Sequence, residues 1–384
     1  MKIIYFTSTQ REKDYRSFMK IWKYPLNSSN QNFHHKLIHA LAKNNEVEVI
    51  SVRPFSRTHT KVLRLKKDMI REGNITWHYL SRRGSRFIRP LTIVPQSKKI
   101  LKKMDLSDTI FVTDTINTSI IRAVDKLRKK FNRPTIGICT DSPSNISGTK
   151  RSYTLYLLKK SKDLEGYIAL TTGLNDLFNQ NNKPAYILEG IVEDEVDLNT
   201  AKEKRPYFFF GGAMMEKYGM YNLIEAFKQL DNKDIDLCIC GHHVDKEKLK
   251  SVTKGVSNIK NLGLLPVNKV LEYEKDAIAC INPRPYSEDL DRFSIPSKTL
   301  EYMSMGRPVI SVRNSILMEK FPHEVIWIND GSVVSIKNAL RNVMSMKEEE
   351  RAHLGEQAKK RVKSLYSISS ISKAIDPFLT QFIK

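Results

Sequence analysis

The residues best suited to chemistry gather in one segment, 282–310, which reads NPRPYSEDLDRFSIPSKTLEYMSMGRPVI. Pro296 is typical of a helix start, and Gly306 followed by Pro308 is typical of a helix stop, so we predict a short helix over 297–305. The amino end of a helix presents unpaired backbone N–H groups and positive dipole charge. This end would therefore suit a diphosphate.

Four side chains in the segment complete a pattern for a nucleoside diphosphate. Ser297 and Glu301 are four positions apart and share one helix face. A carboxylate one turn behind the phosphate could accept hydrogen bonds from a ribose diol, and Lys298 and Arg284 could neutralise phosphate charge. The structural alternative is that Glu301 is an exposed helical acid and Ser297 a plain helix cap.

The segment belongs to a chain in which predicted strands and helices alternate. Apolar runs and helical periodicity predict, in order, a strand at 3–6, a helix at 33–42, a strand at 46–52, a strand at 109–113, a helix at 119–129 and strands at 135–139, 166–170 and 185–188. After a polar interval the alternation restarts with a strand at 207–210, a helix at 220–230, strands at 235–240 and 259–262, a helix at 268–274, a strand at 277–281, the helix at 297–305, a strand at 308–312 and helices at 344–365 and 368–383.

This alternation predicts an α/β protein with two Rossmann-like, doubly wound parallel-sheet domains that face a cleft. We predict the first domain at 1–195, the second at 196–365 and a C-terminal helix at 366–384, for which packing back on the first domain is an open alternative. Ligands of such sheets bind at the carboxyl ends of the strands.

Positive charge is concentrated in the first half of the chain. The net charge is +22, and residues 1–190 hold 35 of the 64 basic residues but only 15 of the 42 acidic ones. Residues 53–103 alone carry 15 basic residues against Asp68 and Glu72. A solvated face, a nucleic-acid patch and a surface on anionic lipid are all open explanations. We favour lipid and expect no nucleic-acid partner, because the sequence shows no known nucleic-acid-binding module.

Other features restrict the class of protein. No apolar run approaches the roughly 20 residues of a membrane-spanning helix. The first residues lack the apolar stretch of a signal peptide. The four cysteines, Cys139, Cys238, Cys240 and Cys280, have neither zinc nor redox spacing, so we expect buried structural thiols in a reducing cytoplasm.

The segment 296–309 closely resembles the PSK…EYM…G.PV motif of the retaining glycosyltransferases with the GT-B fold, specifically glycosyltransferase family 4 (group 1), in the branch associated with bacterial capsule and exopolysaccharide assembly. Residues 211–219, GGAMMEKYG, are similar to the glycine-rich loop that opens that family's donor domain. Weaker similarities at 140–143, 167–171 and 188–190 extend the resemblance over most of the chain.

The resemblance implies roles for the matching residues. Glu301 matches the acid that holds the nucleotide ribose, and Lys217 matches the basic residue that stabilises the departing phosphate. The implied donor-binding residues are Gly211, Gly212, Arg284, Ser297, Lys298, Thr299 and Glu301.

Two positions of the donor site depart from the family pattern. Phe293 stands eight positions before Glu301, where many members have a second glutamate, so another acid must contact the donor sugar. The candidates are Glu288, Asp289 and Asp291. An arginine common early in the glycine-rich loop is missing, and Arg284 and Arg292 are the candidate replacements.

A third departure concerns the first domain, where Asp141 stands near the position of a family histidine. Asp141 would accept the proton of the acceptor hydroxyl or orient a sugar hydroxyl, and capping of the turn at 142–144 is the structural alternative. We predict that His34 and His35, at the start of a helix, have a surface role.

Two DxD triplets, at 234–236 and 289–291, match the manganese pair of the other large glycosyltransferase fold. We assign a metal to neither, and we expect no cofactor besides the nucleotide-sugar substrate.

Together with the resemblance, the cysteines and the missing signal peptide predict a cytoplasmic enzyme, and the basic first half predicts that it associates peripherally with the inner face of the cell membrane. It would transfer a hexose-type sugar, with retention, from a nucleotide diphosphate donor to a polyprenyl-diphosphate-linked glycan. Two alternatives stay open: a nucleotide-sugar epimerase of the same fold, which needs paired carboxylates, and a non-catalytic binder of anionic lipid or polymer.

Overall fold

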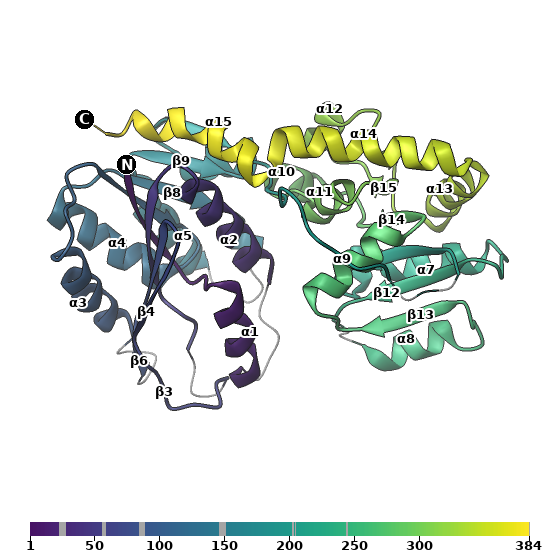
Figure 1. Ribbon diagram of the computed structural model, residues 1–384, viewed down its shortest axis with the longest axis horizontal. Coiled ribbons are helices and arrows are strands. Elements are labelled where there is room, and N and C mark those ends of the chain that lie inside the picture. Colours follow the sequence, from purple (N-terminus) through teal and green to yellow (C-terminus); the bar gives the residue numbers. More distant parts are fainter. Residues whose placement is uncertain are drawn as a thin grey trace. The chain divides into compact units, whose positions relative to one another are not determined.

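A computed structural model describes residues 1–22, 28–55, 59–83, 89–145, 151–201, 203, 205–242 and 245–383. Its internal contacts divide the chain into two units. The first domain comprises Met1–Ile191, Arg292–Ser294 and Ile368–Lys384, and the second comprises Val192–Asp291 and Ile295–Ser367 (Figure 1). The polypeptide therefore enters the first domain three times.

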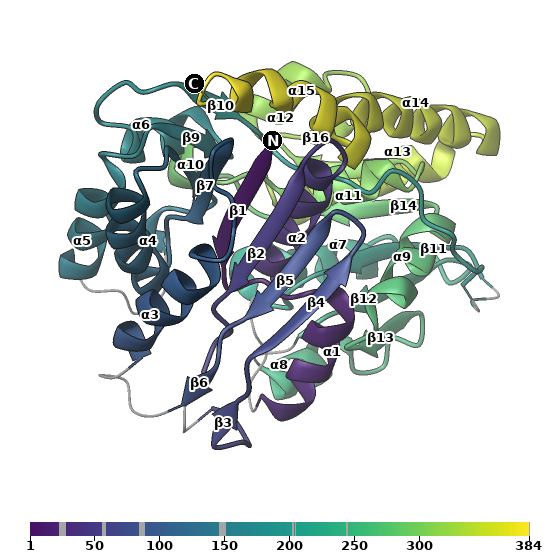
Figure 2. The ribbon, with the colours of Figure 1, turned by 60° about the vertical axis from the view of Figure 1, so that its left-hand side comes forward.

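The first domain is built on a mostly parallel sheet with the strand order β10-β9-β8-β7-β1-β2-β5-β4. Figure 2 shows β1, β2, β5 and β4 side by side. The bounds are β1 (Lys2–Thr7), β2 (Glu46–Ser51), β4 (Asp68–Glu72), β5 (Ile75–Tyr79), β7 (Thr109–Asp114), β8 (Thr135–Cys139), β9 (Gly166–Ala169) and β10 (Ala185–Ile187). A small antiparallel pair, β3 (Arg64–Leu65) and β6 (Arg82–Arg83), lies apart from it.

The sequence did not predict the edge of this sheet. β4 pairs with β5 in antiparallel register, through a turn at Gly73. Both strands lie in the basic segment 53–103. Charged side chains interrupt the apolar alternation in β4, and the polar residues Thr76 and His78 interrupt the apolar run of β5.

The helices of the first domain are α1 (Glu12–Ile21), α2 (Ser28–Ala42), α3 (Arg89–Leu101), α4 (Thr118–Phe131), α5 (Arg151–Ser161), α6 (Thr172–Phe178) and α15 (Ile368–Thr380). One core cluster joins Ile4 and Phe6 of β1 and Phe111 of β7 to Ile120 and Val124 of α4, all fully buried. The apolar face of α4 thus lies on the sheet, because its buried positions recur at helical spacing.

Helix α15 belongs to the first domain through contacts with α2 and β10. Asn45 donates from Nδ2 to Oδ1 of Asp376 at 3.1 Å, and the rings of Tyr186 and Phe378 lie 5.9 Å apart. The chain thus returns to the first domain after it completes the second.

The second domain has a parallel sheet with the order β13-β12-β11-β14-β15-β16. Its strands are β11 (Tyr207–Gly211), β12 (Asp236–Cys240), β13 (Ile259–Gly263), β14 (Ala279–Asn282), β15 (Val309–Val312) and β16 (Ile326–Ile328). Strands are added outward from β11 on one side and from β14 on the other, as in a doubly wound nucleotide-binding fold. This confirms the predicted α/β class, and it places the switch point between β11 and β14.

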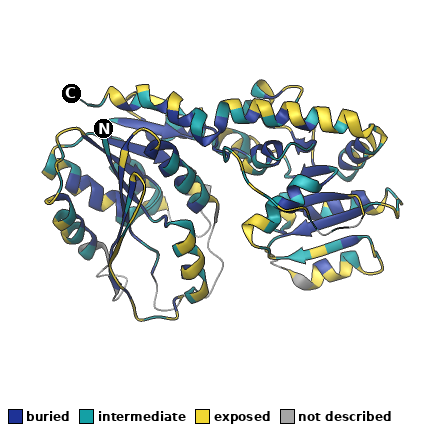
Figure 3. Ribbon diagram, in the orientation of Figure 1, coloured by how far each residue is buried: buried dark blue, intermediate teal, exposed yellow. Residues whose placement is uncertain are grey.

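The helices of the second domain are α7 (Met220–Lys228), α8 (Lys246–Thr253), α9 (Val267–Asp276), α10 (Glu288–Phe293), α11 (Ser297–Ser304), α12 (Ser315–Lys320), α13 (Val333–Ser345) and α14 (Glu348–Tyr366). Of these, α10 ends within the segment Arg292–Ser294 that belongs to the first domain. Figure 3 shows buried strands and helices whose outer faces are exposed.

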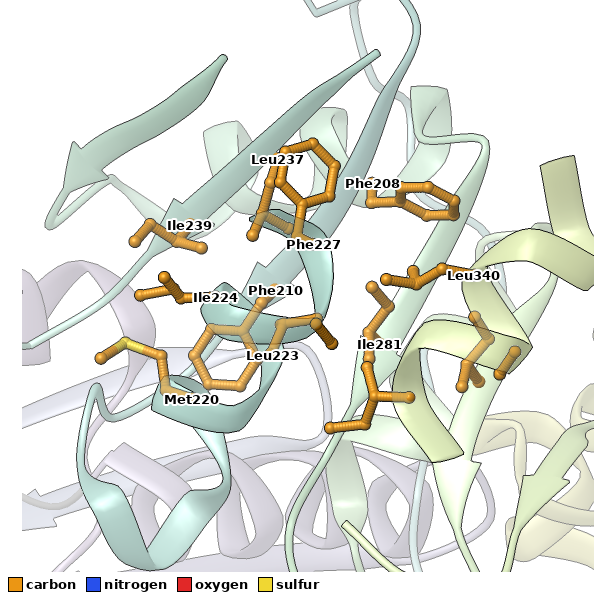
Figure 4. Close-up of a cluster of buried hydrophobic side chains, with 14 of the residues drawn as sticks. Phe208, Phe210, Met220, Leu223, Ile224, Phe227, Leu237, Ile239, Ile281 and Leu340 are labelled. Carbon is orange, nitrogen blue, oxygen red and sulfur yellow. The ribbon is translucent and has the colours of Figure 1, made fainter. Parts of the chain in front are cut away.

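Buried aromatic and aliphatic side chains hold α7 on the second sheet. Figure 4 shows Phe227 of α7 beside Leu237 of β12, and Leu223 beside Phe210 of β11. Each fully buried side chain of this size contributes about 1.5–3 kcal/mol. This core fixes the strand ends from which the candidate site is built.

Candidate functional site

The loops that follow β11 and β14 bring two cations to one aromatic ring. Lys217 lies on a 3-10 turn, Glu216–Tyr218, and its ammonium is 5.1 Å from the ring centroid of Tyr218. The guanidinium of Arg284, which follows β14, is 5.9 Å from the same centroid. Two positive groups near the switch point of a doubly wound sheet have the charge that could pair with a dianion such as a diphosphate.

Close approach of the loops requires glycine at two positions. Gly219 has φ +75°, and a Cβ there would lie 2.0 Å from the carbonyl oxygen of Pro283. Gly241 has φ +149°, and its Cβ would lie 1.7 Å from the carbonyl oxygen of Gly212. Only glycine combines positive φ with such contacts. The loops after β11, β12 and β14 are thus packed backbone to backbone.

Hydrogen bonds fix the amino end of α11 to the same edge of the sheet. Asn282, the last residue of β14, donates from Nδ2 to Oγ1 of Thr299 at 2.9 Å, and that hydroxyl lies 3.1 Å from Oγ of Ser311 on β15. The Tyr302 hydroxyl accepts from the N–H of Gly211 at 2.9 Å and donates to its carbonyl at 3.1 Å. Thr299 is fully buried, so it positions the helix rather than facing a ligand.

The start of α11 differs in detail from the prediction. The helix spans Ser297–Ser304, and Pro296 stands at the cap position without a capping side chain, so Ser297 is not the plain cap of the structural alternative. The N–H groups of Ser297 and Thr299 donate to the carbonyls of Ile295 and Pro296, each at 2.8 Å. Two of the first amides are therefore engaged in a tight turn.

Lys298 and Glu301 form an ion pair beside this helix start. Nζ of Lys298 lies 2.5 Å from Oε1 of Glu301 and 3.3 Å from Oε1 of Glu274 on α9. Glu301 is part-exposed, whereas Glu274 is fully buried. Burial raises the pKa of Glu274 well above its ordinary value, and the charge of Glu301 raises it further.

The two glycines predicted to bind the donor have engaged amides. The N–H of Gly211 donates to Tyr302, and the N–H of Gly212 donates to the carbonyl of Cys240 at 2.9 Å. These glycines allow the backbone of the loop after β11 to pack closely against neighbouring segments.

The candidate sugar-binding acids have different surroundings. Glu288 and Asp289 are exposed at the start of α10. Asp291 instead bonds the start of α12, since its Oδ1 accepts from Nδ2 of Asn314 and from the N–H of Ser315, each at 2.8 Å. Asp291 is therefore committed to a structural role.

The position eight residues before Glu301 is occupied by an apolar anchor. Phe293 packs against a buried cluster of the first domain that includes Leu174 and Phe178. The neighbouring carbonyl of Arg292 accepts from Oγ1 of Thr171 at 2.8 Å. Of the two candidate arginines, Arg284 thus shares the ring of Tyr218 with Lys217, whereas Arg292 belongs to the first domain.

At the carboxyl edge of the first sheet, Asp141 follows β8 and accepts from the N–H of Ser142 at 2.8 Å. This bond fits the predicted turn cap, although Asp141 remains part-exposed. The expectation of a surface role for His34 is wrong, because the ring is fully buried, with Nδ1 2.6 Å from the Tyr5 hydroxyl and Nε2 4.0 Å from Oδ2 of Asp114. Burial lowers the pKa of His34, and Asp114 opposes the shift.

Neither DxD triplet gathers a metal site. Asp236 is buried and lies 2.6 Å from Nζ of Lys260, and Asp291 accepts from the N–H of Ser315 at the start of α12. Within the described ranges, no three His, Cys, Asp or Glu residues are grouped so that they could hold a metal ion. The helices of those ranges include none long and apolar enough to cross a bilayer.

Sequence reasoning found the cations and the helix but missed the residues that position them. Tyr218, Tyr302 and Glu274 were not assigned any role. A glutamate near the end of an ordinary amphipathic helix carries no sequence signal for burial. Tyr218 and Tyr302 lie inside the two recognised motifs, next to the glycines and cations of those motifs. That position in the sequence was the signal from which their role in the site could have been predicted.

Comparison with known proteins identifies the second domain. Residues 192–361 match the family model "Glycosyl transferases group 1", a range that falls within the second domain except for Arg292–Ser294. No curated protein sequence matches this chain.

Solved structures resemble the whole chain. Sucrose-phosphate synthase from Thermosynechococcus elongatus has a TM-score of 0.72 at 13% identity, with 99% of each chain covered. Anabaena Alr3699/HepE in complex with UDP has a TM-score of 0.69 at 11% identity, covering 99% of this chain and 100% of the other. The E. coli structure described as "Trehalose-6-phosphate" bound with UDP-2-fluoro glucose has a TM-score of 0.68 at 10% identity, with 99% of each chain covered. At these identities the likeness shows the fold, which is GT-B.

Proposed function

We propose that this chain, a glycosyltransferase of the GT-B fold whose residues 192–361 form a group 1 domain, moves a sugar with retention from a nucleoside diphosphate to a lipid-linked glycan. The acceptor would be a polyprenyl-diphosphate-linked glycan of bacterial cell-surface polysaccharide synthesis. This narrower assignment follows the family 4 resemblance of residues 211–219 and 296–309.

One observation carries the donor part of the proposal: Lys217 and Arg284 converge on Tyr218 at the switch point of the second sheet. Sugar transfer leaves a nucleoside diphosphate whose negative charge increases as the glycosidic bond breaks. Fixed cations placed where that charge develops stabilise the transition state more than the ground state. Lys217 and Arg284 would supply this stabilisation, and Glu301 would accept hydrogen bonds from the ribose diol.

The names of solved relatives agree with a nucleotide-sugar donor. UDP occupies Alr3699/HepE, and UDP-2-fluoro glucose occupies the E. coli structure. In this chain we assign Asp141 to the acceptor hydroxyl, which would approach the same face of the anomeric carbon that the diphosphate leaves.

The donor assignment is tested by binding and turnover with a panel of UDP-, GDP- and dTDP-sugars. Lys217→Met removes one cation and is expected to lower kcat about 10²- to 10³-fold. Lys250→Met is the matched control, because Lys250 is an exposed lysine that pairs with Glu247 on α8. Equal kcat values for the two variants would contradict the assignment of Lys217.

Glu301→Gln tests the ribose contact in the same assay. We expect a loss of donor affinity of about tenfold or more, since a carboxylate accepts stronger hydrogen bonds than an amide. Glu247→Gln changes an exposed glutamate of the same domain and should leave donor affinity as it is. Unchanged affinity in Glu301→Gln would remove Glu301 from the site.

The membrane part of the proposal is supported by charge at the carboxyl ends of α3 and α4. Their last turns carry Lys98, Lys99, Lys129 and Lys130. Lys98 has its pKa lowered by Lys130 and then by Lys102, so these cations crowd one another. A surface of anionic lipid would relieve that repulsion.

Sedimentation with neutral and anionic vesicles at rising salt tests this surface. Wild type should bind only anionic vesicles, and less as salt rises. Lys102→Glu with Lys130→Glu should weaken binding, whereas Lys233→Glu with Lys254→Glu, equally exposed on the second domain, should not. Binding that is indifferent to lipid charge would refute the membrane assignment.

The epimerase alternative requires paired carboxylates, and the structure favours it less. Phe293 occupies the position where the second glutamate would stand, and Asp291 is bonded to α12. The donor panel separates the two activities, because an epimerase converts the nucleotide sugar without an acceptor.

A further inference from the structure

Glu274 is a buried carboxyl group that the proposed reaction does not yet use. It lies on α9, it is 0% exposed, and its Oε1 accepts from Nζ of Lys298 at 3.3 Å. Its other oxygen, Oε2, is buried without a hydrogen-bond partner among the residues that the structure describes. Burial of a carboxyl group is costly unless it is paired, so a glutamate here needs a reason.

Several titratable groups face Glu274 from the neighbouring elements. Lys298, Glu301 and Tyr302 approach from α11, and the thiol of Cys280 on β14 donates to the carbonyl of Glu274 at 3.5 Å. Burial of the Lys298 ammonium acts to lower its pKa, but Glu301 and Glu274 outweigh that effect and the pKa is raised. Lys298 is therefore a stable cation held between two carboxyl groups.

Exposure separates the roles within this cluster. The side chain of Glu301 is 25% exposed and that of Lys298 is 37% exposed, whereas that of Glu274 is 0% exposed. A ligand could reach Glu301 and Lys298 but not Glu274. Any effect of Glu274 on a ligand must therefore pass through the two residues that it faces, Lys298 and Glu301.

We propose that Glu274 is a positioning residue for donor recognition, which holds the Lys298 ammonium against Glu301 and so fixes the carboxylate that receives the ribose. The inference rests on the proposed function, in which Glu301 binds the ribose diol. Lys298 and Glu301 are three residues apart on α11, so their side chains meet on one helix face. The Lys298 ammonium can restrain the Glu301 rotamer only while the ammonium itself is held in place. Glu274 on α9 holds the Lys298 ammonium in place through their ion pair.

The proposal changes the role expected for Lys298. The sequence pattern suggested that Lys298 neutralises phosphate, but its ammonium is engaged by two carboxyl groups. Phosphate charge then falls to Lys217 and Arg284, and Lys298 serves the ribose end of the donor.

A pair of ligands tests whether Glu274 acts through the ribose. The probes are whichever of UDP, GDP and ADP binds wild type most tightly and its 2′,3′-dideoxy counterpart, measured by isothermal titration calorimetry. Glu274→Leu is expected to weaken the ribose ligand about tenfold and to change the dideoxy ligand by less than about twofold. Glu274→Gln keeps an oxygen that accepts from Lys298, so it should restore most of the affinity.

Glu272→Leu is the matched control. Glu272 is buried on the same helix and pairs with Lys269 at 2.6 Å. It should leave the ratio of the two affinities at the wild-type value. Thermal unfolding of each variant reports the stability change separately.

Lys298→Met provides a second variant if Glu274→Leu does not fold. It should weaken the ribose ligand selectively, and the double variant with Glu274→Gln should bind no more weakly than Lys298→Met alone. Equal losses for both ligands, or a Glu274→Leu variant with wild-type selectivity, would overturn the positioning role. Failure of wild type to bind any nucleoside diphosphate would instead overturn the proposed function.

Discussion

Substitution of Gly219 by alanine should separate the loops that carry Lys217 and Arg284. Gly219 has φ +75°, and its Cβ would lie 2.0 Å from the carbonyl oxygen of Pro283. Real Cβ atoms essentially never approach a heavy atom closer than 3.0 Å, so the two backbones must move apart by an ångström or more. Because both partners are main chain, no side-chain rotation relieves the contact.

The chain supplies a matched control for the backbone strain alone. Gly255 has φ +76°, and nothing lies within 4 Å of its Cβ position. Alanine at either position costs about 1–2 kcal/mol because it holds a left-handed conformation. The overlap at Gly219 should add about 1–3 kcal/mol, as other insertions into packed sites do. The difference between the two variants isolates the close approach.

Urea unfolding measures both free energies, and calorimetry with a nucleoside diphosphate measures the effect on the site. Gly219→Ala should lose more stability than Gly255→Ala and bind the nucleotide at least several-fold more weakly, because Lys217 and Arg284 lie on the separated loops. Gly255→Ala should bind like wild type. Equal stabilities, or unchanged nucleotide affinity in Gly219→Ala, would refute the reasoning.

Two further predictions concern the positioning of α11 and the effect of acid. Tyr302→Phe removes the hydroxyl that bonds both backbone groups of Gly211, so it should cost about 1–3 kcal/mol of stability and weaken nucleotide binding. The control is Tyr207→Phe, which loses one hydrogen bond to the carbonyl of Tyr273 and should cost stability without affecting nucleotide binding. Equal nucleotide affinity of the two variants would contradict this prediction. Burial lowers the pKa of His35 from 6.5 to about 4, with His39 and Lys36 adding to the shift. The unfolded chain therefore takes up the proton first, and stability should fall by up to about 3 kcal/mol between pH 6.5 and pH 4. His35→Phe keeps a ring against Trp77 and should flatten this decline, whereas parallel pH profiles by urea unfolding would contradict the shift.

The α/β alternation was predictable where buried strands consist of continuous apolar runs. β1, β7, β11 and β12 appear in the sequence as short apolar runs because helices cover both sides of such strands. β4 did not, since it is an exposed edge strand in which Met69 is 66% exposed and its neighbours are charged. β5 did not either, although Ile75, Trp77 and Tyr79 are buried, because Thr76 and His78 interrupt its apolar run. The pattern thus detected continuous apolar runs rather than burial itself.

The candidate site could be predicted as a set of cations and a helix but not as a connected structure. Lys217, Arg284 and Glu301 were identified from spacing and from the family resemblance. The bonds of Tyr302 to Gly211, and the pairing of Lys298 with Glu274, join residues far apart in the sequence. Such contacts depend on tertiary structure, for which a single sequence carries no local signal.

Phe293 shows why a departure from a motif can be informative. The sequence placed an aromatic residue where a second acid was expected, and spacing alone gave no reason for it. In the structure Phe293 contacts the apolar cluster around Leu174 and Phe178. A packing residue thus occupies the position where the family pattern has an acid.

The return of α15 to the first domain has a consequence for biosynthesis. Residues 368–380 leave the ribosome only after the entire second domain has been made, so the earlier part of the first domain must wait with the α2 face and Asn45 uncovered. The first domain therefore cannot complete its fold until the second domain has been translated. A truncated gene encoding residues 1–191 should yield an aggregation-prone product, and a fused copy of residues 368–383 should rescue its solubility.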